Sequence, residues 1–305
     1  MTTRLRLLTL IGLLSLAACR DEPPPREFDG QSAFRYLEAQ VAFGPRVPGT
    51  EPHRRMAEWL DSLLRERADT VVVQRWHHVT TRGDTLPLVN FIARFNPAAE
   101  KRILFLAHWD SRPRADGPGS RDSTAAVPGA NDGASGAALL LGVADVLKRA
   151  PPRGVGVDLL FVDGEDYGDF TATPTDVLIG ARHYAANQLP GPAPLYAVLF
   201  DLVADRDLQI YQEGNSLVGA PEVVNLVWET ARRVGHGGTF IDSPRHTLID
   251  DHLELQKAGI RAIDVVDFDY PAWHTPEDTL DKVSAASLQI VGDVAMGLVR
   301  REGGR

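Results

Sequence analysis

Four apolar segments most constrain what this chain can fold into. They cover residues 103–106, 155–162, 195–202 and 262–266. A continuous apolar run of this kind is typical of a β-strand that is buried on both faces of its sheet. Such a strand needs helices above and below it, so the sequence predicts a layered fold with a sheet in the middle.

Apolar residues at helical spacing lie between and around these strands. The predicted helices cover residues 34–41, the segment after Thr50 with Pro52 in its first turn, and residues 134–149, 181–188 and 284–298. Two further strands are predicted at residues 71–73 and 88–95. Because strands and helices alternate, we expect a single α/β domain with a twisted, mostly parallel mixed sheet and helices on both faces.

The N-terminal segment is typical of an exported lipoprotein. Residues 1–18 contain two arginines, a short apolar stretch and small residues before Cys19, which is the pattern of a bacterial lipoprotein signal peptide. We therefore expect lipidation of Cys19, export, and attachment to the outer membrane; the alternative is an ordinary secretory signal with an incidental cysteine. Residues 19–30, with three consecutive prolines, are interpreted as a stiff tether. Residues 31–305 then form the catalytic domain.

Charge and cysteine content exclude some functions. The formal net charge of −9 argues against a nucleic-acid partner, which requires a basic surface. Cys19 is the only cysteine, so the chain has no internal disulfide bond and no cysteine nucleophile. Membrane contact is expected only through the lipid anchor.

Polar residues follow the apolar strands at the points where the strands end. His108 and Asp110 come after the first strand, Glu165 and Asp166 after the second, and Asp201 lies near the end of the third. The carboxyl ends of parallel strands meet at one edge of a sheet, where open α/β sheets bind ligands. We therefore expect these side chains to lie close together.

Two more segments add candidate metal ligands. Asp132 lies in a glycine-rich turn before the helix at residues 134–149, and His274 follows the fourth strand, directly after Trp273. Imidazole nitrogen and carboxylate oxygen are zinc ligands, and the lack of a thiol favours a catalytic site over a structural one. Cobalt or manganese would also suit these donors.

Each candidate also has a simpler interpretation. Asp132 alone could cap the following helix, and the Glu165-Asp166 pair could belong to a solvated loop. His274 could be a packed surface histidine. The Asp250-Asp251-His252 segment could simply begin a helix, because aspartate is favoured in a first turn.

Other catalytic motifs are missing from the sequence. It contains no serine nucleophile elbow, no His-Glu-x-x-His, no P-loop and no Gly-x-Gly-x-x-Gly. His77 and His78 lie in a strand-like stretch without a partner signal, so we interpret them as structural.

Together these segments resemble the M28 zinc metallopeptidase family, and within it the glutaminyl-peptide cyclotransferases (glutaminyl cyclases). The resemblance covers roughly residues 31–300, with the motifs in the family order. The matching positions are His108, Asp132, Glu165-Asp166, Asp201 and His274. The resemblance implies a zinc aminopeptidase-like fold in which Asp132, Asp166 and His274 bind zinc and Glu165 is the general acid and base.

Three features resemble the cyclase branch in particular. Trp273 precedes His274, as in the cyclases, where this indole lines the substrate pocket. Asp250-Asp251-His252 resembles the cyclase Asp-Asp-His, and residues 176–183 resemble the segment after the acidic pair. The resemblance implies that Asp201 and Asp250 are also catalytic, and that they share protons with Glu165 through hydrogen bonds.

The chain also departs from the animal cyclases. The second acid of the pair is Asp166 rather than glutamate, and this shorter ligand requires a closer backbone. The tryptophan expected shortly after the pair is missing, and no disulfide bond is possible near Asp132.

The motifs are compatible with two reactions on peptide or protein N-termini. In a cyclase, one zinc ion activates an N-terminal glutamine, which cyclises to pyroglutamate and releases ammonia. In an aminopeptidase, a second zinc ion would be bound by His108 and Asp201, with Asp132 bridging the two ions, and the N-terminal residue would be hydrolysed. A lipid-anchored binding protein is the remaining alternative.

Overall fold

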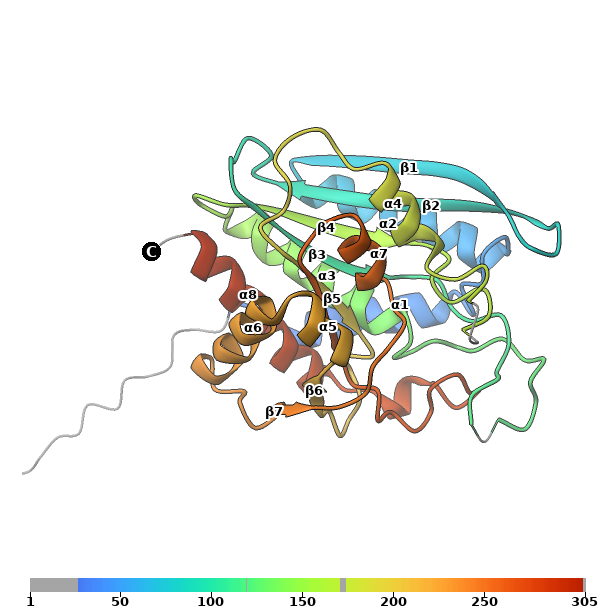
Figure 1. Ribbon diagram of the computed structural model, residues 1–305. Helices are drawn as coiled ribbons and strands as arrows, with labels where there is room; N and C mark the ends of the chain where they lie inside the picture. Colours follow the sequence, from blue (N-terminus) through green and yellow to red (C-terminus); the bar gives the residue numbers. More distant parts are fainter. Residues whose placement is uncertain (1–26, 119, 171–173, 304–305) are drawn as a thin grey trace, which may run out of the picture.

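A six-stranded sheet with the strand order β1-β2-β4-β3-β5-β8 forms the centre of the computed structural model (Figure 1). The structure describes residues 27–118, 120–170 and 174–303. The strands of this sheet are β1 (Thr70–Val79), β2 (Thr85–Phe95), β3 (Arg102–His108), β4 (Gly156–Val162), β5 (Ala197–Asp201) and β8 (Ala262–Val266). β3, β4, β5 and β8 are parallel, whereas β2 pairs antiparallel with both β1 and β4. The predicted mixed, mostly parallel sheet is confirmed.

Helices cover both faces of this sheet, as predicted. They are α1 (Gly30–Ala42), α2 (Glu51–Arg67), α3 (Ala134–Arg149), α4 (Ile179–Ala186), α5 (Gly214–Gly219), α6 (Pro221–Arg233), α7 (His252–Lys257) and α8 (Ala285–Gly303). In Figure 1, α4 and α7 lie in front of the sheet and α1 to α3 lie behind it. Successive residues of β3 point to opposite faces: Phe105 packs into the apolar cluster of α1, α2, α3 and α8, and Leu104 into that of α4 and α7.

The folded domain begins before residue 31. Phe28 is buried, and the Asp29 carboxylate accepts hydrogen bonds from the backbone N–H groups of Gln31 and Ser32, which caps α1. Residues 28–30, which the sequence analysis placed in the tether, therefore pack with the domain. Residues 1–18, Cys19 and most of the tether lie outside the described residues. Within the described part of the chain, no helix combines the length and apolarity needed to cross a membrane.

A small second sheet lies between β5 and β8 in the sequence. It consists of β6 (Ile210–Gln212) and β7 (Phe240–Pro244), and α5 and α6 lie between these two strands. The apolar pattern of the sequence did not predict this insertion. It matters for the site because the next segment, residues 245–251, leads from β7 to the edge of the main sheet where the parallel strands end.

The four parallel strands bring distant segments to this edge. β3 ends at His108, β4 at Val162, β5 at Asp201 and β8 at Val266. The loops after β4 and β8 and the turn before α3 extend beyond the same edge, which is where open α/β sheets place their ligand sites.

Candidate metal centre

Asp132, Asp166 and His274 come together at the carboxyl edge of the sheet. Their nearest ligand atoms all lie within 4.8 Å of one another. His274 Nε2 is 3.2 Å from Asp166 Oδ1 and 3.5 Å from Asp132 Oδ2. All three side chains are buried. The structure thus brings together the three residues that the sequence analysis proposed as zinc ligands.

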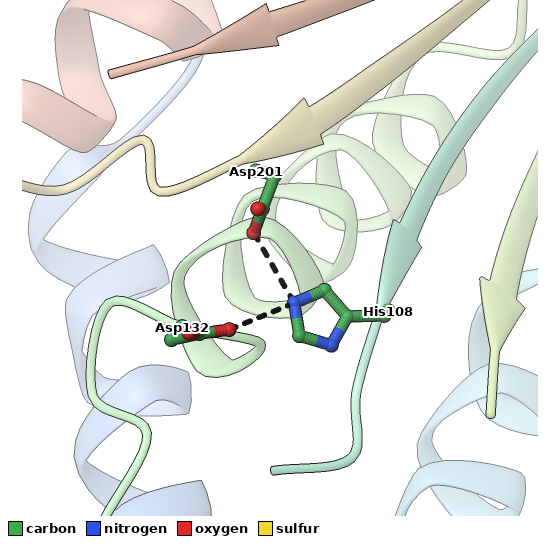
Figure 2. Close-up of side chains that lie close together, drawn as sticks. All are labelled: His108, Asp132 and Asp201. Atoms are coloured by element: carbon green, nitrogen blue, oxygen red, sulfur yellow. Dashed lines mark hydrogen bonds and ion pairs between the residues drawn. The ribbon is translucent and has the colours of Figure 1, made fainter. Parts of the chain in front are cut away.

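A second group shares one of these carboxylates. His108 Nε2 lies 3.2 Å from Asp132 Oδ1 and 3.2 Å from Asp201 Oδ1, as Figure 2 shows. His108 and Asp201 stand at the ends of β3 and β5, and Asp132 reaches them from the turn before α3. Asp132 therefore faces both groups, which is the arrangement expected of a carboxylate that bridges two metal ions.

The unpaired atoms of these residues fit a cation. Asp132 Oδ2 and Asp166 Oδ2 are buried and have no hydrogen-bond partner among the described residues. A buried polar atom without a partner is costly, and a carboxylate oxygen is a natural ligand for a divalent cation. Imidazole and carboxylate donors together suit zinc.

The charges at the site also favour a bound cation. Burial disfavours the charged form of His274, but the neighbouring Asp166 and Asp116 outweigh burial and raise the pKa of His274 to about 9. Burial and the nearby Asp166 raise the pKa of Asp132. Without a cation, protons are therefore retained between these carboxylates, and a metal ion would displace them.

The turn before α3 directs Asp132 into the site rather than along the helix. Gly133, with φ of 88°, is the N-cap of α3, and no side chain caps the helix. The interpretation of Asp132 as a helix cap is therefore wrong. The Asp278 carboxylate accepts hydrogen bonds from the backbone N–H groups of Asn131 (2.8 Å) and Asp132 (3.1 Å), which fixes the turn.

The loop after β4 is held by a carboxylate of the preceding motif. Asp110 Oδ1 and Oδ2 accept hydrogen bonds from the backbone N–H groups of Glu165 (3.2 Å) and Asp166 (3.3 Å). Asp163 accepts a hydrogen bond from the backbone N–H of Val89 and pairs with His53. Glu165 and Asp166 are 7% and 1% exposed, so the alternative of a solvated acidic loop is wrong.

Glu165 lies among acids that favour its protonated form. Burial raises the pKa of Glu165 well above its usual value; His108 opposes this effect, and Asp166 and Asp250 add to it. Burial and the charge of Asp201 raise the pKa of Asp250 to about 8. Groups shifted in this way can exchange protons near neutral pH. The hydrogen bonds expected among Glu165, Asp201 and Asp250 stay a prediction.

A cavity of about 270 Å³ opens beside these groups. Its polar wall includes Glu165, and its apolar wall consists of Phe170, Leu248, Ile249, Phe268 and Trp273. The Trp273 indole stacks on the His274 imidazole at 3.8 Å between ring centroids and packs edge-on against Phe268. A larger cavity of about 730 Å³ lies on the other side of residues 270–275, but none of the candidate ligands lines it.

The simpler interpretations of the Asp250-Asp251-His252 segment and of His78 agree with the structure, and Asp250 also contributes to the site. Asp251 is the N-cap of α7, which begins at His252, so this segment does begin a helix, while Asp250 also lines the 270 Å³ cavity. His78 Nε2 is 2.8 Å from Asp176 Oδ1, an interaction on the far strand β1 that agrees with a structural role.

Sequence reasoning missed several residues that hold the site. Arg46, although fully buried, donates hydrogen bonds to the carbonyl oxygens of Pro128 and Gly129 in the turn before Asp132. Arg112 and Asp278 contact backbone or side-chain atoms of the candidate ligands. The only available signal was proximity: Arg112 follows the His108 motif directly, and Asp278 lies four residues after His274.

Comparisons with known proteins agree with this geometry. The sequence model of peptidase family M28 matches residues 90–299. A glutaminyl-peptide cyclotransferase of Drosophila melanogaster is 28% identical over 272 residues, which span 80% of this chain and 73% of the fly protein.

Two solved structures resemble the fold over nearly its full length. One is the Bacteroides thetaiotaomicron glutaminyl cyclase bound to N-acetylhistamine, with a TM-score of 0.86 and 32% identity, covering 91% of this chain and 99% of that protein. The other is a Zn-dependent exopeptidase from Parabacteroides distasonis, with the same TM-score, identity and coverage. The same fold and comparable identity therefore occur in a cyclase and in an exopeptidase.

Proposed function

This chain belongs to peptidase family M28, and from that premise we propose that it is a zinc-dependent glutaminyl-peptide cyclotransferase. It would convert an N-terminal glutamine of a peptide or protein to pyroglutamate and release ammonia. The observation that carries this proposal is Trp273, which lines the 270 Å³ cavity while it stacks on His274, one of the three clustered ligand candidates.

Asp132, Asp166 and His274 are the residues that would hold the zinc ion. When bound, zinc supplies a Lewis acid that polarises the γ-carbonyl group of the substrate glutamine. Cyclisation forms a bond between the substrate α-nitrogen and its γ-carbonyl carbon. It breaks the bond from that carbon to the side-chain amide nitrogen, which leaves as ammonia.

Glu165 would move the proton that this exchange requires. The α-amine must lose a proton as it attacks, and the leaving nitrogen must gain one. The raised pKa of Glu165, caused by its burial, lets one carboxyl group accept the first proton and return it. Asp201 and Asp250 would assist the catalytic proton transfer: when ionised, Asp250 raises the pKa of Glu165, and Asp201 raises the pKa of Asp250 in the same way.

The pocket would contribute by holding the substrate in place for the attack rather than by taking part in the chemistry. Attack is intramolecular, so holding the glutamine side chain in a bent conformation contributes much of the rate. Trp273 and Phe268 form an apolar wall against which the side chain can pack, and the cavity is small enough to favour a single residue.

The second candidate function is hydrolysis by an M28 aminopeptidase with two zinc ions. The grouping of His108 and Asp201 around the shared Asp132 favours it, since this group could hold a second ion. In that reaction Glu165 would deprotonate a water molecule instead of the substrate amine.

Zinc counting together with product analysis separates the two reactions. The purified protein is offered a peptide with N-terminal glutamine and, separately, leucine amide, and zinc per chain is measured. One zinc ion with ammonia and a pyroglutamyl product supports the cyclase. Two zinc ions with free leucine would contradict the cyclase and support the aminopeptidase. Bound zinc without either product would support a binding protein.

Export and lipid anchoring are also part of the proposal. Support comes from the sequence pattern of residues 1–18 and from Cys19 at its end. The enzyme would then act on peptides outside the cytoplasm, held at the outer membrane through Cys19 and the residues that lead from it to Phe28.

A further inference from the structure

Arg112 is a buried cation at the side of the proposed zinc ligands. The residue is 3% exposed, and its guanidinium contacts two acids. Nη1 donates to Asp166 Oδ1 at 2.7 Å and to the Asp166 carbonyl oxygen at 3.1 Å. Nε and Nη2 donate to the two carboxylate oxygens of Asp116 at 2.5 and 2.7 Å. One side chain therefore joins Asp166 to Asp116.

Asp116 in turn contacts the other end of the site. Its Oδ1 lies 3.6 Å from His274 Nδ1, and the backbone N–H of Gly117 donates to the His274 carbonyl oxygen at 2.9 Å. A Cβ atom at Gly117 would lie only 2.3 Å from the carbonyl oxygen of Trp273. The chain at residues 116–117 is thus pressed against the segment that carries His274.

These contacts form a closed ring. It runs from Asp166 through Arg112 and Asp116 to His274, whose Nε2 returns to Asp166 at 3.2 Å. The geometry points to Arg112 and Asp116 as a pair of positioning residues that fix Asp166 and His274 for zinc binding. The inference rests on the zinc centre of the proposed function and assigns roles to two residues outside the ligand set.

Each member of the pair has a definite task. The Asp116 carboxylate faces Nδ1 of His274 at 3.6 Å, and a proton held on Nδ1 leaves the Nε2 lone pair free to bind a metal. Arg112 occupies Oδ1 of Asp166 and leaves Oδ2 without a partner, so one oxygen remains for the ion. By holding the carbonyl oxygen as well, Arg112 draws in the backbone of a ligand whose side chain is short.

The alternative is that Arg112 only offsets the negative charge of the site. Lysine separates the two roles, because it keeps the positive charge but lacks the planar fork that contacts two acids at once. Arg112→Lys should therefore preserve the charge and lose the positioning. Asp116→Asn removes the carboxylate from the other end of the ring.

Zinc affinity is the measurement that tests the pair. We expect Arg112→Lys and Asp116→Asn each to raise the zinc Kd by about 10–100-fold in chelator competition, as is typical when the partner of a ligand is lost. The double variant should bind zinc about as weakly as the worse single variant, because the two residues act together. Activity of each single variant should rise again when zinc exceeds its new Kd.

Arg102→Lys is the matched control. Arg102 is also buried, and its Nε and Nη2 donate to the two carboxylate oxygens of Asp158, but it begins β3, whereas His108 ends that strand at the edge of the site. The zinc Kd of Arg102→Lys should stay within about twofold of that of the parent protein. Unchanged zinc affinity in both test variants, or an equal loss in Arg102→Lys, would overturn the inference.

Failure of this inference is distinguishable from failure of the proposed function. A parent protein that binds no zinc contradicts both, whereas a parent that binds zinc as tightly as its folded variants contradicts only the role of the pair. If Arg112→Lys does not fold, Asp116→Asn decides, because the Asp116 side chain is 34% exposed and less embedded in the core.

Discussion

Glu165 is the residue on which the proposed proton transfer depends. Glu165→Gln keeps the size of the side chain but cannot take a proton from the substrate amine, so kcat should fall by about 10²–10⁴-fold. Zinc content should not change, because Glu165 is outside the clustered ligand group. Glu277→Gln, at an exposed residue near His274, is the control and should leave kcat unaltered. Near-normal turnover in Glu165→Gln would remove Glu165 from the mechanism.

Single residues were predictable where their chemistry and position in the sequence coincide. Asp132, Asp166 and His274 could be named because each carries a ligand atom and follows a strand or precedes a helix. Arg112 and Asp278 could not, because each acts through a contact with a segment far away in the chain. A charged loop residue looks the same in the sequence whether it faces water or a buried carboxylate.

At the scale of elements, the turn into α3 depends on Gly133. Its φ is 88°, and a Cβ atom there would lie 2.2 Å from the carbonyl oxygen of Asp110. Gly133→Ala should therefore destabilise the fold and weaken zinc binding, because Asp110 holds the loop of Glu165 and Asp166. Urea unfolding and zinc titration measure both effects.

Gly83 provides the matched control for this substitution. It has φ of 90° but no atom near the position of a Cβ. Gly83→Ala should lower the unfolding free energy only by the cost of a positive φ for a residue with a Cβ atom, about 1–2 kcal/mol, and zinc binding should be normal. If Gly133→Ala costs no more than Gly83→Ala, the close contact with Asp110 does not constrain the turn.

Glu213 links α5 to the loop that lines the pocket. Its carboxylate accepts hydrogen bonds from the backbone N–H groups of Asn215, Ser216 and Leu248. Burial alone would raise its pKa, but His252 and these N–H donors outweigh burial and lower the pKa of Glu213 to about 2. The ionised carboxylate therefore stabilises the folded state.

The sign of the resulting pH dependence is set by this lowered pKa. The stabilisation is complete above the unfolded pKa of about 4.3 and is lost as the pH falls towards about 2. The unfolding free energy should drop more steeply over this range in the parent than in Glu213→Gln, as measured by urea unfolding at several pH values. Glu229→Gln, at an exposed acid, should keep the steep slope; equal slopes in the parent and in Glu213→Gln would contradict this role.

Elements were predictable where apolar residues repeat regularly. Each buried parallel strand appears as a continuous apolar run, and α3 follows its stripe of leucine and valine residues. The small sheet was missed because β6 has only three residues, too few for an alternating pattern. β1 is much longer than the predicted strand because pairing with β2 extends it through polar residues such as His77.

At the scale of the whole molecule, zinc should join segments that are far apart in the chain. Because zinc would bind the folded state only, a free concentration about 1,000-fold above Kd should add about 4 kcal/mol to the unfolding free energy. For a domain of this size, that corresponds to a rise in Tm of roughly 10 °C. Thermal unfolding with zinc and with a chelator tests this expectation. His274→Ala should lose the zinc-dependent rise, and an unchanged Tm in the parent would contradict a zinc centre here.

The proposed membrane attachment depends on Cys19 alone. Cys19→Ala should abolish lipid incorporation, measured with a labelled fatty acid, and should release the protein from the membrane fraction. Activity on peptides should persist, since the domain from Phe28 onwards has its own core. Equal membrane attachment of the parent and of Cys19→Ala would exclude the lipid anchor.

The overall architecture could be predicted because it needs only the order and burial of the strands. Alternation of buried strands and helices leaves few arrangements, and a mostly parallel sheet covered on both faces is one of them. The cavity beside Trp273 could not be predicted, because it forms from the loop after β7, the loop after β8 and Phe170. Their relative placement depends on tertiary packing alone.

The three clustered ligands lie far apart in the sequence, and this separation determines where the protein can acquire its metal. Asp132, Asp166 and His274 meet only after β8 has joined β5, late in the order of the chain. A nascent or unfolded polypeptide offers the ion no ready-made cage. An exported chain would therefore load zinc from the supply on the far side of the membrane, and scarcity in that compartment, rather than inside the cell, would limit how much working enzyme exists.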